Sequence, residues 1–298
     1  MNLTQRDVFL TGIARDIEVR ENKTKEGKEY ISLNVSLDTN GRAKDENHVE
    51  NTIRVDFFAM KHNSKGGVSK LYETYKNLSE EVNTVKNNPD SPDMLRIGMG
   101  ELQENYWNKR STARVSATFC NIANDRQPEN KFEIEGFISN IRPEMDKEGI
   151  ETGRAIVTLC MVGGYENSED PQKSRYDLNV LDFITEPNND AAAEYILSNY
   201  QKNDFIKLAG KVVRELKREV VQTPSAFGRP IANTKNTLIS ELRIESGTEA
   251  VDNPLSDAEI QTLAAERNAK HLAIDNQAEE KATQPKQPEK PKSGGWSI

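Results

Sequence analysis

The chain runs through the same order of segments twice, and this internal repeat constrains the fold more than any other feature. The first copy opens with VFLTGIARDIE (residues 8–18) and the second with FEIEGFISNIR (residues 132–142). Gly136 in the second copy falls where Gly12 falls in the first, and the later segments correspond in the same order. A repeat with a period of about 125 residues indicates a tandem duplication of one domain.

Each copy is expected to contain three strands, one helix and then two further strands. In the first copy, residues 30–37 alternate strictly between apolar and polar side chains, as a half-buried strand does. Residues 69–85 then carry apolar side chains at helical spacing, and residues 191–204 take their place in the second copy. Five antiparallel strands with a helix between the third and the fourth describe the OB-fold, a Greek-key barrel whose open face and loops bind oligonucleotides.

The end of the chain differs in composition from the two copies. Residues 253–274 can form a helix capped by Ser256, although its apolar stripe is thin. Residues 281–295 are rich in Pro, Lys and Gln, a composition that does not bury enough surface to fold. We therefore predict a mostly β chain with two tandem OB-fold domains, each a five-stranded Greek-key barrel, at residues 1–127 and 128–248, and a flexible, partly helical C-terminal tail at 249–298.

Composition and motifs exclude several classes of protein. No apolar run approaches the roughly 20 residues that span a bilayer, and the N-terminus lacks a signal-peptide pattern, so we expect a soluble, cytoplasmic protein. Cys120 and Cys160 lie in separate apolar runs and predict two buried, reduced thiols. The histidines share no ligand spacing with them, so we predict neither a metal site nor another cofactor.

Catalytic motifs are also missing from the sequence. No serine or cysteine has a histidine partner nearby, and no glycine-rich phosphate loop of the Walker or Rossmann kind is present, which favours a protein that is not an enzyme. Asp56 and Asp182 recur at matching strand positions. One carboxylate per copy is too few for a two-metal nuclease, so these acids predict structural hydrogen bonds.

A protein that binds single-stranded nucleic acid needs cations that follow the phosphates and aromatic faces on which unpaired bases stack. In the first copy, residues 106–114 supply both within nine residues. Trp107 lies there among polar residues, either as a stacking platform or as a lid over the end of the barrel. Phe58 lies on the polar face of its strand or packs under the helix. The candidate residues of the first copy are Tyr30, Arg54, Phe58, Tyr106, Trp107, Lys109, Arg110 and Arg114.

Residues 211–235 of the second copy predict a basic hairpin in a chain whose formal net charge is −8. Its six lysines and arginines outnumber its two glutamates, so the hairpin is either a surface for a polyanion or a solvated loop. Tyr176 belongs to an earlier strand whose register leaves open whether its ring faces outward. The candidate residues of the second copy are Arg154, Tyr176, Lys211, Arg214, Lys217, Arg218, Phe227 and Arg229.

The order VFLTG, YISLNV and IRVDFFA in the first copy resembles that of single-stranded DNA-binding proteins with an OB-fold. Duplicated OB domains are similar to those of some bacteriophage and archaeal members, which implies the cytoplasm of a bacterial host if the protein is viral. The resemblance also implies a tail whose apolar tip, here Trp296 and Ile298, recruits replication and repair proteins. The bacterial family has acidic residues before that tip, whereas this chain has Lys290 and Lys292, so recruitment of the same partner by the same pocket does not follow.

We therefore predict a non-enzymatic protein that binds single-stranded DNA with little sequence preference and acts in DNA replication, recombination or repair. RNA remains open as a ligand, because contact with the 2′-hydroxyl group depends on geometry. Two alternatives are a structural or adaptor protein whose barrels bind protein partners, and an enzyme subunit whose barrels present DNA to a catalytic partner.

Overall fold

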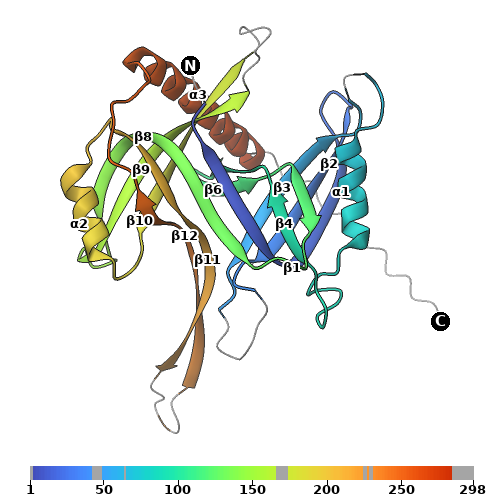
Figure 1. The fold of residues 1–298 in the computed structure, drawn as a ribbon, viewed down its shortest axis with the longest axis horizontal. Helices are drawn as coiled ribbons and strands as arrows, with labels where there is room; N and C mark the ends of the chain where they lie inside the picture. Colours follow the sequence, from blue (N-terminus) through green and yellow to red (C-terminus); the bar gives the residue numbers. More distant parts are fainter. Residues whose placement is uncertain are drawn as a thin grey trace.

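The chain folds into a mostly β structure, which confirms the predicted fold class (Figure 1). This computed structural model describes residues 3–41, 49–63, 65–165, 174–223, 227 and 231–283. The elements of the first half are β1 (Arg6–Lys23), β2 (Glu29–Asp38), β3 (Thr52–Met60), α1 (Lys70–Glu81), β4 (Met94–Gly98), β5 (Gly100–Trp107), β6 (Arg110–Ser116) and β7 (Phe119–Ile122).

The strand pairings of the first half close into an OB barrel. Strand β1 pairs antiparallel with β2, and β2 pairs antiparallel with β3. Strand β3 then pairs parallel with β6, β6 pairs antiparallel with β5, and both β5 and β4 return to β1. Because α1 lies between β3 and β4, this circuit has the connectivity of a five-stranded Greek-key barrel whose fourth strand is interrupted at Met99, where φ is 52°.

The second half follows the same circuit. Its elements are β8 (Glu129–Met145), β9 (Glu151–Tyr165), β10 (Arg175–Thr185), α2 (Asp190–Asn199), β11 (Phe205–Thr223) and β12 (Ile231–Gly247). Strands β8, β9 and β10 pair antiparallel in order, β10 pairs parallel with β12, and β11 joins β12 to β8. Figure 1 shows the β11–β12 hairpin extending beyond the body of the molecule.

The glycines that mark the repeat occupy places where a side chain does not fit. A Cβ atom on Gly12 would lie 2.7 Å from the carbonyl oxygen of Asp38, and one on Gly136 would lie 2.5 Å from that of Cys160. Just after each glycine the pairing register shifts, in β1 between residues 14 and 16 and in β8 between residues 138 and 140. Each opening strand is therefore bent by a bulge next to a glycine, which curves the sheet into a barrel.

Burial follows the predicted alternation. The apolar face of β2 is fully buried, whereas Ser32, Asn34 and Ser36 are only partly covered. Cys120 and Cys160 are free and buried, as predicted, and burial raises the pKa of their thiols to about 12 and about 11. Both thiols therefore remain protonated and unreactive at neutral pH.

The two barrels share one continuous sheet, because residues 6–11 of β1 pair antiparallel with residues 129–134 of β8. Asn51 of the first barrel makes the second contact between the barrels, and Asn130 holds the same stretch of β11 from within the second barrel. The Asn51 amide donates to the Val212 carbonyl oxygen at 2.9 Å and accepts from the Arg214 backbone N–H at 2.6 Å. Asn130 exchanges two hydrogen bonds with the Val212 backbone, at 2.8 and 3.0 Å. Strand β11 is thus fixed against the first barrel where its hairpin begins to project.

The segment after the second barrel forms α3 (Asp257–Thr283), which Figure 1 shows lying across the molecule from the second barrel toward the first. Ser256 caps it as predicted, since the Ser256 N–H donates to Glu259 and the Glu259 N–H donates to the Ser256 hydroxyl. Leu263 is 3% exposed and packs against the outside of β8–β10. Among the described residues no helix is long and apolar enough to cross a membrane.

Candidate nucleic-acid interface

The hairpin between β5 and β6 presents Trp107 at its tip. Trp107 pairs with Arg110, and the two residues between them, Asn108 and Lys109, have φ angles of 52° and 59°. A positive φ at both positions is the geometry of a type I′ two-residue hairpin. The Trp107 side chain is 63% exposed, so most of its surface faces solvent.

Tyr106, the neighbour of Trp107, is covered by α3. Its ring stacks on that of His271 with 3.6 Å between ring centroids and 6° between the planes, and its hydroxyl donates to Asp275 at 2.9 Å. That hydrogen bond raises the pKa of Tyr106. Lys109 lies 3.5 Å from Glu279 of the same helix. Sequence reasoning identified Tyr106 and Lys109 as candidates but not their partners, which lie more than 160 residues away in the chain.

The outer face of β2 and β3 carries the second aromatic group. The rings of Tyr30 and Phe58 are 5.1 Å apart and tilted by 36°. Phe58 is 55% exposed and therefore points outward and does not pack under α1. Between this pair and the hairpin lie Arg54 and Arg114, whose guanidinium groups contact Asp56 at 3.1 and 2.7 Å.

These groups lie along one line. Strand β6 runs parallel to β3, and Val115 lies opposite Val55. The tip of the β5–β6 hairpin therefore extends past the first residue of β3, whereas Phe58 lies near the last residue of β3. At 3.3 Å per residue the tip and Phe58 are about 25 Å apart. The first barrel thus presents an aromatic residue, then two arginines, then an aromatic pair. Arg110 is exposed near the tip.

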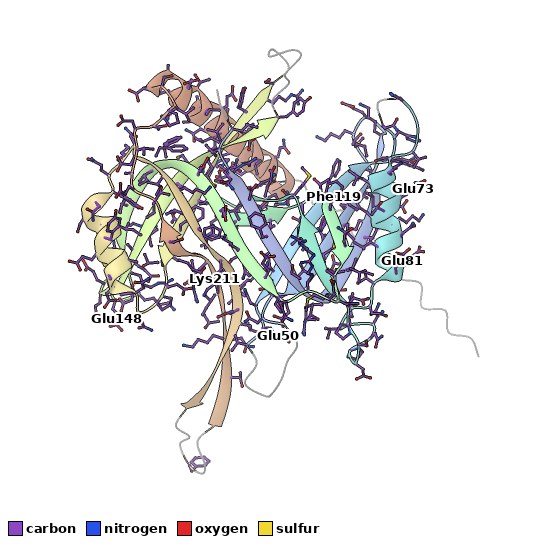
Figure 2. All side chains as sticks on the ribbon, viewed as in Figure 1. Glu50, Glu73, Glu81, Phe119, Glu148 and Lys211 are labelled. Carbon is purple, nitrogen blue, oxygen red and sulfur yellow. The ribbon has the colours of Figure 1, made fainter. Side chains whose placement is uncertain are left out.

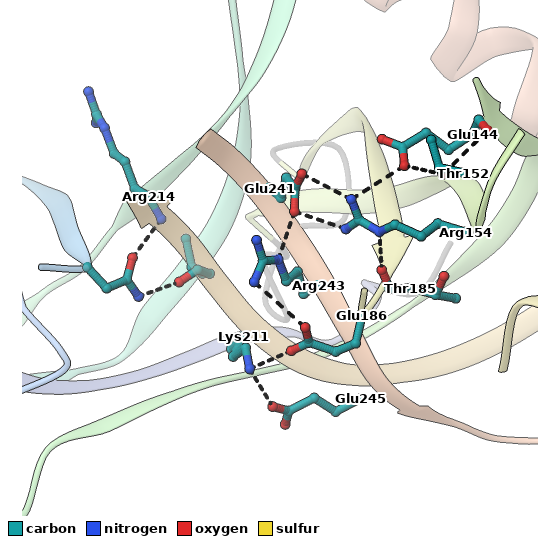
Figure 3. Close-up of polar contacts among 12 residues, drawn as sticks. Glu144, Thr152, Arg154, Thr185, Glu186, Lys211, Arg214, Glu241, Arg243 and Glu245 are labelled. Atoms are coloured by element: carbon teal, nitrogen blue, oxygen red, sulfur yellow. Dashed lines mark hydrogen bonds and ion pairs between the residues drawn. The ribbon is translucent and has the colours of Figure 1, made fainter. Parts of the chain in front are cut away.

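Two of the cations predicted for the second barrel, Arg154 and Lys211, are bound to acids (Figure 3). The Arg154 side chain is 11% exposed, and it donates to the Thr185 carbonyl oxygen and contacts Glu144 and Glu241. Lys211, labelled in Figure 2 where β11 leaves the body of the molecule, forms ion pairs with Glu186 and Glu245. These acids compete with a phosphate for both side chains, and phosphate binding by Arg154 and Lys211 stays a prediction.

Arg214 differs from these two residues. Its backbone is held by Asn51, while its exposed side chain points away from the ion-pair network in Figure 3 and has no acidic partner among the described residues. Lys217 is also exposed, and Phe227 is 90% exposed.

Tyr176 is half-buried and packs against the apolar cluster that includes Leu263, so its ring is not an open platform. Predictions for the Arg218 side chain, Arg229, Trp296 and Ile298 lie outside the described residues.

A groove of about 450 Å³ lies between the two barrels. Arg54, Arg214 and Arg267 line it, together with the hydroxyl groups of Ser111, Thr112, Thr158 and Ser240. Two acids also line it, but each has a basic partner: Asp182 lies 2.8 Å from Arg142, and Glu241 binds Arg154 and Arg243. Arg267 is bound to Glu104, and the hydroxyl groups of Ser111, Thr112 and Thr158 donate to Glu104, Asn105 and Asp182. Arg214 is therefore the arginine of this lining that has no acidic partner among the described residues.

Asp56 and Asp182 have the structural use that the sequence predicts. Asp56 accepts from Asn34 and two arginines, and Asp182 accepts from Thr158 at 2.6 Å. Among the described residues no group of three or more His, Cys, Asp or Glu side chains is placed to hold a metal ion.

Glu104 of β5 joins three parts of the site and was not identified from the sequence. Its carboxylate, 5% exposed, accepts from Arg267 at 2.7 and 2.5 Å, from the Ser111 hydroxyl, and from the Val180 N–H at 3.2 Å. Burial raises the pKa of Glu104, but the hydrogen bonds and charge of Arg267 outweigh that effect, so its pKa is lowered. The buried pair connects the hairpin, α3 and β10.

Comparisons relate the chain to known proteins. The structure of the wild-type single-stranded DNA-binding protein from Thermus aquaticus is similar over 86% of this chain and 97% of that chain, with a TM-score of 0.48 and 15% identity. A replication protein A heterotrimer bound to single-stranded DNA is similar over 91% of this chain and 53% of that chain, with a TM-score of 0.21 and 11% identity. No curated protein matches the sequence. The family model described as YorF matches residues 6–281, so the chain belongs to the YorF family.

Proposed function

We propose that this protein binds single-stranded DNA with little sequence preference and without catalysing a reaction. The observation that carries the proposal is the line of exposed groups on the first barrel, from Trp107 through Arg54 and Arg114 to Phe58. Stacking platforms interleaved with cations are what an unpaired strand requires, because every base has a stacking face and every nucleotide has a phosphate.

In the proposed mechanism, bases stack on Trp107 and on the Tyr30–Phe58 pair, and the phosphates between them contact Arg54 and Arg114. Among the described residues, a phosphate competes for these arginines with one carboxylate, that of Asp56. Both arginines are about half exposed, so exchanging this ion pair for a phosphate costs little.

The strand continues, in this proposal, through the groove between the barrels to Arg214. Support comes from the lining of the groove, which includes Arg54, Arg214 and the Ser240 hydroxyl group, while its two acids are paired. The two barrels would then bind one strand together, and residues 1–127 and 128–248 would be the two binding domains. A net charge of −8 disfavours duplex DNA outside these local cationic sites.

The role in the cell is a further part of the proposal. Replication, recombination and repair expose single strands, and a binder that tolerates any sequence suits each of them. Trp296 and Ile298 at the end of the chain are proposed to recruit partner proteins, and a bacteriophage origin remains part of the same hypothesis.

The experiment is a titration of tryptophan fluorescence with a dT oligonucleotide in the Trp296→Phe variant, in which Trp107 is the remaining tryptophan. We expect saturable quenching that weakens at higher salt and is absent with duplex DNA of the same length. An RNA oligonucleotide of the same sequence measures the preference for the sugar. Failure to bind dT, by fluorescence and by a second method, would refute the proposal and favour a protein-binding adaptor.

A further inference from the structure

We propose that the Tyr106 face of the β5–β6 hairpin is a nucleobase site, and that α3 occupies it in this structure with His271 in the place of the base. This inference rests on the proposed function and adds an internal competitor to it. Single-stranded DNA and the second half of α3, residues 271–283, bind the same hairpin in turn.

The first observation is the geometry of the stack. The imidazole of His271 lies parallel to the Tyr106 ring at a centroid separation of 3.6 Å and an angle of 6°. Aromatic side chains in proteins usually meet offset or edge to face, with larger separations. A planar nitrogen heterocycle stacked face to face on tyrosine is the arrangement that a nucleobase adopts on an aromatic platform.

The second observation is the placement of negative charge beside that stack. Asp275 accepts a hydrogen bond from the Tyr106 hydroxyl at 2.9 Å, and Glu279 lies 3.5 Å from Lys109. Residues 271, 275 and 279 follow at intervals of four, so one face of the helix presents a heterocycle followed by two carboxylates. A nucleotide strand presents the same chemistry, a base followed by phosphates, to the same tyrosine and lysine.

The third observation is that the two halves of α3 are held differently. The first half buries Leu263 and pairs Arg267 with the buried Glu104. Removal of that half would leave a buried carboxylate without its charged partner, which is strongly unfavourable. Among the described residues, the half from His271 onward is held to β5 and the hairpin by the stack, by a 3.7 Å contact between His271 Nε2 and Glu104, by the hydrogen bond to Asp275 and by the exposed Lys109–Glu279 ion pair, and its Leu272 is 62% exposed.

The second half can therefore leave the hairpin while the first half stays in place. Its Leu272 is already exposed, and an exposed ion pair contributes little to holding it. An incoming strand replaces His271 on the Tyr106 ring with one of its bases, and it replaces Glu279 beside Lys109 with one of its phosphates. Duplex DNA keeps its bases paired and cannot make this exchange, so the helix would also add to the selectivity for single strands.

The test compares dT affinity, measured by fluorescence anisotropy, in the wild-type chain, His271→Ala and Asp275→Asn, with Gln277→Ala as the matched control on an exposed part of the same helix. If the docked helix lowers the fraction of molecules with a free site, His271→Ala strengthens binding by about three- to tenfold. Asp275→Asn strengthens it less, and the control leaves it unchanged. An affinity that is unchanged or weaker in His271→Ala would overturn the inference.

A double variant separates direct competition from an indirect effect. In a Tyr106→Ala background, His271→Ala should no longer strengthen binding, because the shared site is gone. Hydrogen exchange gives an independent measure: added dT should speed exchange of the amides of residues 271–283 and leave residues 257–267 unchanged. A gain that persists without Tyr106, or slower exchange at 271–283, would contradict competition for this ring.

The two hypotheses fail in different ways. If the folded wild-type chain and His271→Ala both fail to bind dT, the proposed function is wrong. If both bind with the same affinity, the proposed function stands and the internal competitor is refuted. Circular dichroism melting of each variant establishes that the chain is folded, and the Arg267–Glu104 pair is left intact in every variant so that the first half of α3 stays docked.

Discussion

The two barrels share a strand circuit but use their arginines differently. On the outer face of the first barrel, Arg54 and Arg114 share the single carboxylate of Asp56. In the second barrel, Arg154 binds two glutamates, Glu144 and Glu241, and is nearly buried. Cationic side chains in the first barrel are therefore available to an anionic ligand, whereas Arg154 stabilises the fold.

The hairpins between the last two strands differ as well. In the first barrel the hairpin is short, closes in a two-residue turn and is covered on one side by α3. In the second barrel, β11 and β12 pair over a much longer stretch and project from the body. Two barrels with the same strand circuit can thus present different surfaces, and in the proposed function the first supplies most of the ligand face and the second supplies an arm. This comparison can be tested by variants in each barrel.

The largest effect is expected from the aromatic residues of the first barrel. Trp107→Ala and Phe58→Ala should each weaken dT binding by about 1–3 kcal/mol, the value of one stacked base. Tyr195→Ala, an exposed aromatic residue on α2, is the control and should leave affinity unchanged. Anisotropy titrations at one salt concentration measure all three. Equal losses for Tyr195 and Phe58 would remove the distinction between the ligand face and the rest of the surface.

The second effect separates a free arginine from a paired one. Arg214→Ala should weaken dT binding several-fold and reduce the slope of log affinity against log salt by about 0.7, as expected for one lost phosphate contact on a single strand. Arg154→Ala should instead lower the free energy of unfolding by about 1–3 kcal/mol, because Glu241 loses a hydrogen-bonded partner.

Salt-dependent titrations and denaturant melts measure the two outcomes. A changed salt slope in Arg154→Ala, with Arg214→Ala silent, would reverse the assignment of the two residues. A loss of stability in Arg154→Ala without any change in slope would confirm that its ion pairs serve the fold.

These residues also show how far sequence reasoning reaches. The repeat, the strand order and the buried face of β2 follow from periodicity, because a strand with one buried face must alternate. The pairing of Arg154 with Glu241 could not be predicted, because 87 positions separate the residues and only the closed barrel brings them together. The same holds for His271 on Tyr106, since a helix with a thin apolar stripe does not indicate which surface it contacts.

The third effect tests whether the barrels act as one unit. Asn51→Ala removes hydrogen bonds that hold β11 to the first barrel at Val212 and Arg214. We expect reduced stability and a smaller gain in affinity as dT oligonucleotides lengthen, since a looser contact lowers the effective concentration of the second barrel. Short oligonucleotides that fit one barrel should bind as before.

Asn199→Ala on the exposed end of α2 is the control for this series. If affinity rises with oligonucleotide length as steeply in Asn51→Ala as in the wild-type chain, the two barrels bind independently. A parallel loss for oligonucleotides of every length would instead indicate that Asn51 acts on the first barrel alone.

The smallest effect is a dependence on pH at α3. Burial and the charge of Arg267 lower the pKa of His271, while Glu104 and Asp275 oppose that shift, and the ring faces Tyr106. Because the pKa of His271 is lower in the docked helix, the neutral ring favours docking. This contribution to docking is fully present at pH values above the ordinary pKa of about 6.5, and it is lost as the pH falls through the pKa of the docked state.

Acidification from about pH 7.5 to about pH 5.5 should therefore release the second half of α3 and expose Tyr106. In His271→Gln, which cannot titrate, the helix should respond less over the same range. The ratio of dT affinities between His271→Gln and the wild-type chain isolates this effect, because changes in all other charges cancel in the ratio. We expect the advantage of the variant to shrink by about twofold at the lower pH. A ratio that grows on acidification would mean that protonated His271 holds the helix on the hairpin.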